Sequence, residues 1–199
     1  MKKFCLGLLL LTQASLFGGS VIAQQAITTD EIIQSLKPKV RTRGPPGPSL
    51  KAEDAAFIER IKHTTRGLTV EERTQLSDIV STAGLPSIDL EVMFALNSAT
   101  LDQSAIETLQ RLGAALKAPE LSNASFLIAG HTDARGTLDY NQKLSEDRAR
   151  VVKSFLSTNF QVLTERLISV GYGQEQLKNQ VDPFADENRR VKIINLGKN

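Results

Sequence analysis

One arginine interrupts the apolar face of an expected helix at residues 141–156. Leu144, Val152 and Phe155 share that face, and at about 100° per residue Arg148 projects only about 40° from Leu144. A guanidinium in such a stripe has a large desolvation cost unless acceptors satisfy its five donors. The sequence therefore predicts an anionic partner for Arg148.

Asp133 is the obvious candidate for this partner. It lies in the loop 130–136, directly after the short apolar run 126–129, which is typical of a buried strand. Two interpretations are open. In one, Asp133 and Arg148 form a structural ion pair. In the other they are separate poles of a cleft, where Arg148 binds a carboxylate and Asp133 binds an ammonium group, so that an amino acid would fit.

Hydrolytic catalysis has little support. His131, Asp133 and Ser145 supply the three residue types of a catalytic triad, but Ser145 has no G-x-S-x-G motif around it and lies near the start of a helix. The pair Arg189 and Arg190 could form an anion site, although a solvated strand entry is the commoner explanation. We therefore expect a protein that is not an enzyme.

Metal and cofactor sites are not predicted either. His63 and His131 lie in different segments without a ligand motif, and Cys5 is the only cysteine. The chain has 24 basic and 22 acidic residues, no tryptophan and two tyrosines, which disfavours nucleic acid as a partner.

Residues 1–23 resemble a cleavable signal peptide. Two lysines precede a short apolar run, and Val21 and Ala23 occupy the positions that a signal peptidase recognises. The alternative is an uncleaved anchor, but the run is shorter than the roughly 20 apolar residues of a membrane span. Cys5 is too far from the cleavage site for lipid attachment, so we expect an exported chain without a lipid anchor.

Residues 24–86 are expected to form a linker and short helices. Four of the seven prolines lie within residues 38–48, which predicts an extended tether. Helical apolar spacing occurs at residues 30–36, at Ala52–Lys62 and at residues 70–82, where Thr69 and Glu72 form a capping box. We expect the last two helices to be an appendage to the main domain.

Residues 87–199 are expected to form that domain, an α+β unit in the order β-α-β-α-β. Strand and helix patterns alternate along it, which favours a parallel neighbouring pair with helices packed on the sheet. The expected strands are 88–94, 126–129, 167–170 and 190–196, and the expected helices are Gln103–Leu116 and 141–156.

Four motifs of this unit resemble the peptidoglycan-binding C-terminal domain of outer membrane protein A, over about residues 88–196. They are GHTDARG at 130–136, NQKLSEDRA at 141–149, GYG at 171–173 and NRRV at 188–191. The resemblance implies a two-layer domain, a mixed sheet with helices on one side. The segment QEQL at 174–177 departs from the family, which commonly has an acidic residue and a proline there.

The resemblance also implies a ligand, the meso-diaminopimelate of the peptidoglycan stem peptide. Asp133 and Arg148 would hold its ammonium and carboxylate groups, and Asn141, Thr132 and Asn97 would be supporting polar contacts. It implies a non-catalytic wall-binding protein in the periplasm of a Gram-negative bacterium, with outer-membrane association as an option. An alternative is an adaptor whose residues 24–86 engage an envelope protein or the outer-membrane surface, with wall binding secondary.

Overall fold

The computed structural model describes residues 26–38, 50–64, 67–95 and 97–198, and these ranges hold five α-helices and four strands. The predicted signal peptide and nearly all of the proline-rich stretch lie outside them. The elements are α1 (Thr29–Leu36), α2 (Ala52–Lys62), α3 (Val70–Ala83), β1 (Ser87–Leu90), α4 (Gln103–Leu116), β2 (Ala124–Gly130), α5 (Leu138–Phe160), β3 (Leu167–Gly171) and β4 (Val191–Lys198), with short 3-10 turns at Thr164–Arg166 and Asp186–Asn188.

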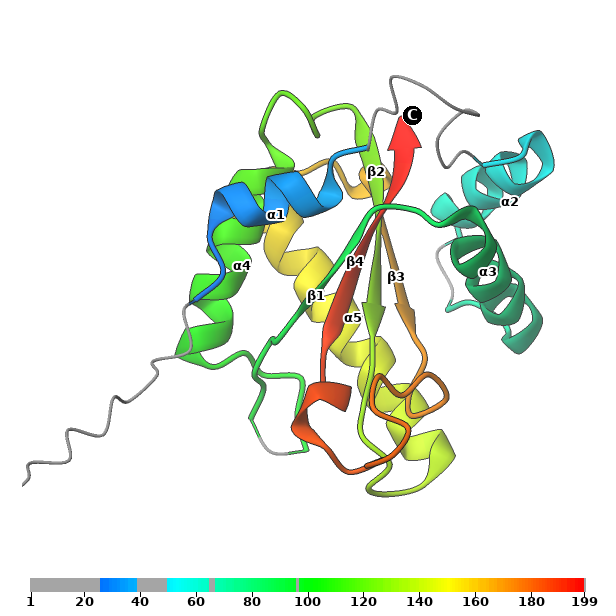
Figure 1. The fold of residues 1–199 in the computed structure, drawn as a ribbon, viewed down its shortest axis with the longest axis vertical. Helices are drawn as coiled ribbons and strands as arrows, with labels where there is room; N and C mark the ends of the chain where they lie inside the picture. Colours follow the sequence, from blue (N-terminus) through cyan, green and yellow to red (C-terminus); the bar gives the residue numbers. More distant parts are fainter. Residues whose placement is uncertain (1–25, 39–49, 65–66, 96, 199) are drawn as a thin grey trace, which may run out of the picture.

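The four strands form one mixed sheet in the order β1-β4-β2-β3 (Figure 1). Strands β2 and β3 are parallel and joined through α5, whereas β4 is antiparallel to both β1 and β2. The α+β class and the mixed sheet are confirmed. Because β2 and β3 run in parallel, the loops after both strands meet at one end of the sheet, beside the first half of α5.

One face of the sheet is covered by α1, α4 and α5, which share a single apolar core with it (Figure 1). Helix α5 lies very close to the sheet because glycines face it. A Cβ at Gly130 would lie 2.3 Å from the backbone oxygen of Ser145, and one at Gly171 would lie 2.4 Å from the backbone nitrogen of Glu146. These two glycines thus set the distance between the strand ends and the helix that carries Arg148.

The opposite face of the sheet is covered by α2 and α3, so the expectation that these helices form an appendage is wrong. Phe57 and Ile61 of α2 and Leu76 of α3 are buried in a second core with sheet residues that include Leu127 and Ile168. The physical reason lies in β2, which is buried at all seven positions and needs cover on both faces. Residues 87–198 supply the two expected layers, and the preceding helices add a third.

Helix boundaries follow capping chemistry. Helix α4 has the predicted bounds, and the predicted capping box of α3 is present, with the Glu72 backbone N–H donating to Thr69 Oγ1 at 3.2 Å. Helix α5 is longer than expected. It begins after Thr137, whose hydroxyl accepts from the backbone N–H of Tyr140, and it ends at Gln161 in the left-handed region with φ of 55°.

Strand β1 is shorter than the expected 88–94 although the alternation continues beyond Leu90. Its ladder partner β4 begins at Val191, directly opposite Leu90, so later residues have no strand to pair with. Phe94 forms only an isolated bridge with Leu101. The alternation of apolar and polar residues therefore predicted which side chains are buried. The start of β4 determines where β1 ends.

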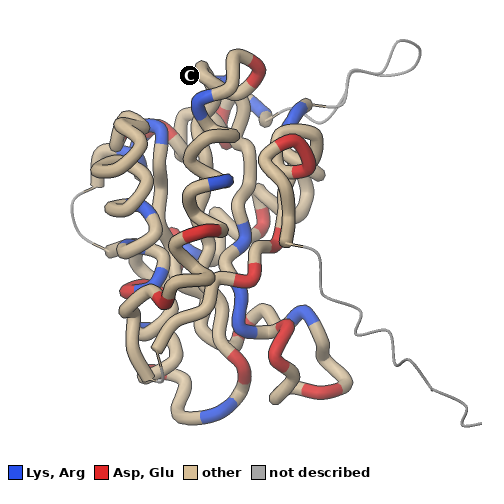
Figure 2. The backbone as a smooth tube through the Cα atoms, turned by 90° about the vertical axis from the view of Figure 1, so that its left-hand side faces the viewer, with Lys and Arg blue, Asp and Glu red and all other residues tan. Residues whose placement is uncertain are grey.

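Basic and acidic residues are interspersed along the backbone, as Figure 2 shows. Within the described ranges, none of the helices combines the length and the apolar character that crossing a membrane requires.

Candidate ligand-binding site

Asp133 lies in the loop after β2 and is 5% exposed. Its Oδ2 accepts hydrogen bonds from Arg189 Nη1 at 2.9 Å and from Arg135 Nη1 at 3.2 Å, and its Oδ1 accepts from the backbone N–H of Arg135 at 3.0 Å. The carboxylate is therefore fixed in orientation and already paired with arginine.

Arg189 is the partner of Asp133, and this pairing was not predicted from the sequence. It lies between two carboxylates, with Nη2 2.7 Å from Asp186 and Nη1 on Asp133. Burial lowers the pKa of its guanidinium, but the hydrogen bonds to Asp133 and Asp186 outweigh burial and raise that pKa overall. The signal was present in the NRRV motif, but no sequence pattern shows a pairing across 56 residues.

The preference for a solvated strand entry at Arg189 and Arg190 is wrong for both residues. Arg190 Nε donates to Asp89 Oδ1 of β1 at 3.0 Å, and its Nη2 donates to the Gln176 carbonyl at 3.2 Å. The buried amide of Asn188 holds the preceding loop, with its Nδ2 3.0 Å from the Asp182 carbonyl. The segment before β4 is thus built to fix two guanidinium groups.

Arg148 is 9% exposed and has no carboxylate within 4.0 Å among the described residues. Its Nε donates to the Ser98 carbonyl at 3.1 Å, and its guanidinium carbon lies 4.8 Å from the centre of the Phe94 ring. The expected anionic partner is absent from the described residues, and so is the structural ion pair with Asp133. A carbonyl and an aromatic face accommodate the charge instead.

The electrostatic surroundings of Arg148 nevertheless include the Asp133 cluster. Burial lowers the pKa of the Arg148 guanidinium, the nearby Tyr140 and Asp133 raise it, and Arg189 lowers it. Arg148 and Asp133 are therefore groups of opposite charge that influence each other without forming an ion pair or a hydrogen bond.

Asn141 and Thr132 lie beside Asp133 and shape its loop. Asn141 is buried, and its Nδ2 lies 3.3 Å from the Asp133 carbonyl, 2.9 Å from the Arg135 carbonyl and 2.5 Å from Gln174 Oε1. The Thr132 backbone N–H donates to the Gly173 carbonyl at 2.9 Å, whereas its buried hydroxyl has no partner in the part of the chain that the structure describes. Asn141 therefore orders the loop, and the Thr132 hydroxyl retains an unused donor and acceptor.

Asn97 lies in a different segment, the turn before α4. It is exposed and has a φ of 50°, and the Ser98 carbonyl that follows it accepts the hydrogen bond from Arg148. The structure thus gathers Asp133, Thr132 and Asn141 in one loop and puts Arg148 on the adjacent helix. Asn97 is linked to this group only through its neighbour.

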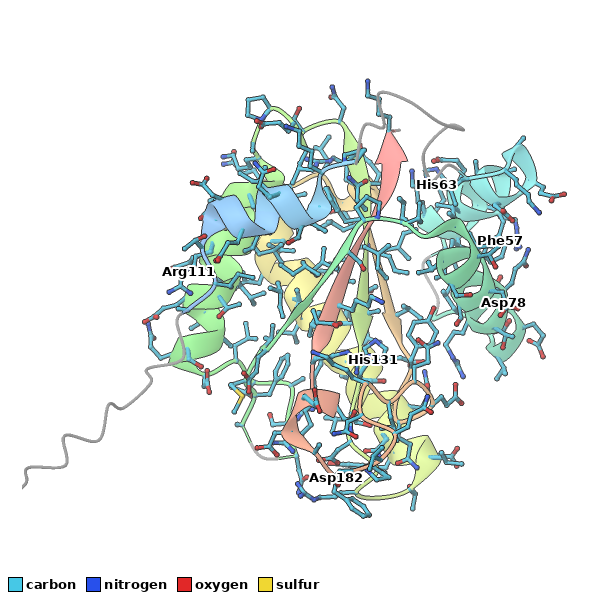
Figure 3. The ribbon with its side chains drawn as sticks, in the orientation of Figure 1. Phe57, His63, Asp78, Arg111, His131 and Asp182 are labelled. Carbon is cyan, nitrogen blue, oxygen red and sulfur yellow. The ribbon has the colours of Figure 1, made fainter. Side chains whose placement is uncertain are left out.

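The three residue types of a triad do not form one. Ser145 Oγ is buried, accepts from the Gly173 backbone N–H at 2.9 Å and donates to the Gln142 carbonyl at 2.8 Å. His131 lies at the sheet (Figure 3), and both of its ring nitrogens are buried without a partner among the described residues. Ser145 thus serves to hold the β3 end, and no hydrogen bond connects it to a base.

His131 is neutral for reasons of packing. Its ring stacks on Tyr172 with centroids 5.7 Å apart, and burial, assisted by Arg190 and Lys192, lowers its pKa to about 3. Both residues border a cavity of about 350 Å³ between α3 and the sheet. Within the described ranges, no group of three or more His, Cys, Asp or Glu residues is arranged to hold a metal ion.

Known proteins similar to this chain share the site-bearing region. The model of the OmpA family matches residues 93–190. Outer-membrane lipoprotein YfiB of Pseudomonas aeruginosa is 30% identical over 151 residues, which cover 75% of this chain and 80% of that protein. The peptidoglycan-associated lipoprotein of Brucella melitensis biotype 1 is 32% identical over 107 residues, 52% of this chain and 62% of the relative.

Outer membrane porin F of Pseudomonas aeruginosa is 31% identical over 142 residues. The match covers 67% of this chain but only 37% of porin F, so the likeness concerns one part of that longer protein. The family match and the YfiB alignment over most of both chains show the family of this chain, and the motifs around Asp133 and Arg148 agree with it. This chain belongs to the OmpA family.

Proposed function

We propose that this protein is a non-catalytic module that binds cell-wall peptidoglycan through the diaminopimelate of the stem peptide. Membership of the OmpA family supports the polymer, as does a relative that is named for its association with peptidoglycan. The proposed ligand end carries an ammonium and a carboxylate on one carbon. Asp133 takes the ammonium and Arg148 takes the carboxylate.

The observation that carries the proposal is that Arg148 has no anionic partner among the described residues. Its side chain is nearly buried, yet only Nε has a hydrogen-bond partner within the described residues. A planar guanidinium presents two further nitrogens in a fork that matches a carboxylate. A ligand carboxylate would therefore supply the anion that the protein does not.

Asp133 can accept an ammonium without losing its orientation. Arg135 is 63% exposed on its side chain, whereas Arg189 is 31% exposed and also paired with Asp186. A ligand ammonium would therefore replace the exposed Arg135 guanidinium, while Arg189 and the Arg135 backbone N–H keep the carboxylate in place. An exposed ion pair contributes little, so this exchange costs little.

Co-sedimentation with purified cell walls tests the proposal. Walls with diaminopimelate should bind the protein, whereas walls with lysine at that position, which lack the second carboxylate, should bind it at least about tenfold more weakly, as for loss of one charge-assisted pair. Asp133→Asn and Arg148→Lys should each weaken binding to a similar extent.

The matched controls are Asp139→Asn and Lys143→Ala, which change exposed residues of the same helix and should retain binding. Thermal unfolding would establish that all four variants fold. Undiminished binding by both folded site variants would overturn the proposed site, and equal binding to the two kinds of wall would overturn the ligand.

The same proposal assigns the protein to the periplasm of a Gram-negative bacterium, since only there would the module meet the wall. The names of YfiB and porin F support outer-membrane association. Recovery of the protein in the wall and outer-membrane fractions after cell breakage would bear this out, and recovery in the cytosolic fraction would contradict it.

A further inference from the structure

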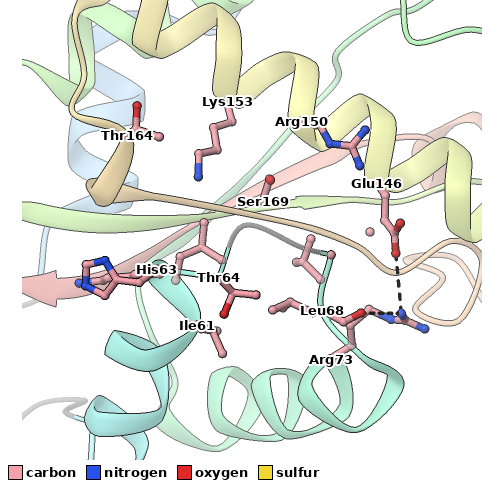
Figure 4. Close-up of a pocket in the computed structure, with 15 residues that line it drawn as sticks. Ile61, His63, Thr64, Leu68, Arg73, Glu146, Arg150, Lys153, Thr164 and Ser169 are labelled. Atoms are coloured by element: carbon pink, nitrogen blue, oxygen red, sulfur yellow. Dashed lines mark hydrogen bonds and ion pairs between the residues drawn. The ribbon is translucent and has the colours of Figure 1, made fainter.

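A second hollow lies at the outer edge of strand β3, and neither Asp133 nor Arg148 lines it. It has a volume of about 400 Å³ and is bordered by α5, by β3 and by the segment from the end of α2 to the start of α3. Figure 4 shows Arg150 and Lys153 of α5 on one side, Ile61 and Leu68 on the other, and Ser169 of β3 between them. We refer to it as the edge groove.

The edge groove runs beside backbone groups that lack a strand partner. Strand β3 ends the sheet order β1-β4-β2-β3, and the Tyr172 N–H donates to the Gly130 carbonyl of the β2 side. Since successive residues of a strand face opposite sides, the N–H and carbonyl of Ser169 face away from β2.

The two ends of this outer edge are already closed. The outward carbonyl of Gly171 accepts from Gln142 Nε2 at 2.8 Å, and the Leu167 N–H donates to the Thr164 carbonyl. For Ser169, between them, the described residues provide no hydrogen bond on the outer side. An unpaired edge of this kind is a template on which an extended peptide can add as a further strand.

The charge around the groove selects the peptide. Four of its lining residues are basic, namely Lys62, Arg73, Arg150 and Lys153, and Glu146 is the only acidic one. Three of these four already have an acidic partner: Lys62 is paired with Glu59, Arg73 lies 3.7 Å from Glu146, and Arg150 Nη1 lies 2.5 Å from Asp147. Lys153 is half-buried, and no carboxylate in the described part of the chain contacts it.

Two further atoms mark the groove as incompletely satisfied. Burial alone lowers the pKa of the Lys153 ammonium, which means that its charge has lost water without gaining a counter-charge. Within the described ranges Arg73 Nε is buried without a partner, although its Nη1 donates to the Leu68 carbonyl at 3.3 Å. A carboxylate entering the groove would stabilise both residues.

The residues outside the described structure do not supply an acidic occupant. Residues 1–25, 39–49, 65–66, 96 and 199 are the parts of this chain outside the described structure, and none of them is Asp or Glu. The stretch 38–48 is instead basic and rich in proline, which lacks the N–H that a strand must donate. No such segment of this chain supplies the chemistry that the groove requires.

We propose that the edge groove binds an extended acidic peptide of a partner protein, which adds to the free edge of β3 at Ser169 and pairs a carboxylate with Lys153. The site is separate from the wall-binding loop. The protein could therefore bind the wall and a partner at the same time, because the two ligands would not compete for one site.

Fluorescence anisotropy on the full chain tests this with a labelled peptide, Thr-Glu-Val-Glu-Val-Glu-Thr, and its counterpart with lysine in place of glutamate. The acidic peptide should bind and the basic one should not. An acidic peptide with alternate backbone nitrogens methylated should bind about tenfold more weakly, because it cannot complete the strand pairing.

Lys153→Ala should weaken binding of the acidic peptide about tenfold, while Lys143→Ala, an exposed lysine of the same helix, should not change it. No binding of the acidic peptide, equal binding of the methylated one, or an unchanged affinity in Lys153→Ala would each overturn the proposal. Asp133→Asn should retain peptide binding, and Lys153→Ala should retain wall binding, so the two proposals fail separately.

Discussion

Arg189 Nη1 lies 2.9 Å from Asp133 Oδ2, and this contact joins the end of β2 to the segment that enters β4. Arg148, the arginine nearer in sequence, does not touch that carboxylate. Arg189 therefore forms the ion pair with Asp133 that was considered for Arg148. Arg189 orients the acid, and Arg148 keeps its fork available.

A double-mutant cycle distinguishes these roles. We expect Asp133→Asn and Arg189→Ala to be coupled by about 1–3 kcal/mol in the free energy of unfolding, since a hydrogen-bonded charge pair with a nearly buried acid is broken. The cycle of Asp133→Asn with Arg148→Ala should give less than about 0.5 kcal/mol. Denaturant unfolding measures both, and a larger coupling for Arg148 would contradict the arrangement.

Acid stability should depend on His131. Burial lowers the folded-state pKa of His131 to about 3, below its unfolded value, so the unfolded chain binds a proton that the folded chain does not as the pH falls from about 6.5 to about 3. This histidine should therefore remove stability in that window at up to about 1.4 kcal/mol per pH unit.

The matching variant is His131→Phe, which replaces two partnerless ring nitrogens by an apolar ring of similar shape. Its unfolding free energy should decline less steeply between pH 6.5 and pH 4 than that of the wild type. His63→Gln, at an exposed histidine, should keep the wild-type slope. Equal slopes for His131→Phe and the wild type would refute the assignment.

Gly171→Ala should destabilise the fold by about 1–3 kcal/mol, as for overpacking in a core that cannot relax. The added Cβ would lie 2.4 Å from the backbone nitrogen of Glu146, and a helix backbone cannot rotate away as a side chain can. Gly67→Ala is the control, because nothing lies within 4 Å of its Cβ position. Thermal unfolding compares them, and similar losses would mean that α5 does not approach β3 so closely.

Ser145→Ala should cost about 1–3 kcal/mol of stability, because the buried Gly173 N–H loses its acceptor. Ser154→Ala, at an exposed serine of the same helix, should be nearly neutral. Neither the wild type nor Ser145→Ala should release soluble muropeptides from purified walls. Release by the wild type that disappears in Ser145→Ala would revive a hydrolase.

Local chemistry explains which parts of the fold could be predicted. The bounds of α4, the Thr69 capping box and the positions of the strands follow from periodicity and capping, which depend on residues close in sequence. Burial of Arg148 followed from its place in an apolar stripe. Its partners did not, because the Ser98 carbonyl and the Phe94 ring come from a segment about 50 residues earlier.

The same distinction explains the larger error. The apolar faces of α2 and α3 were visible in the sequence, but a helical stripe does not state which surface it covers. Strand β2 is buried at every position, so both faces of the sheet are covered. The apolar run at 126–129 indicated a buried strand, but it did not show that helices cover both faces. The length of β1 depends on where its partner β4 begins, so it could not be predicted from the residues of β1 alone.

The third layer makes the cooperative unit larger than residues 93–190, the segment that the family model matches. A fragment beginning at Ser87 would keep every residue of the Asp133 loop. Without α2 and α3, however, it would expose Leu127, Ile168 and Ile194 to water. Transferring the Asp133 loop to another protein together with its supporting sheet would therefore require α2 and α3 as well. In this chain, two helices that lie outside residues 93–190 shield one face of that sheet from solvent.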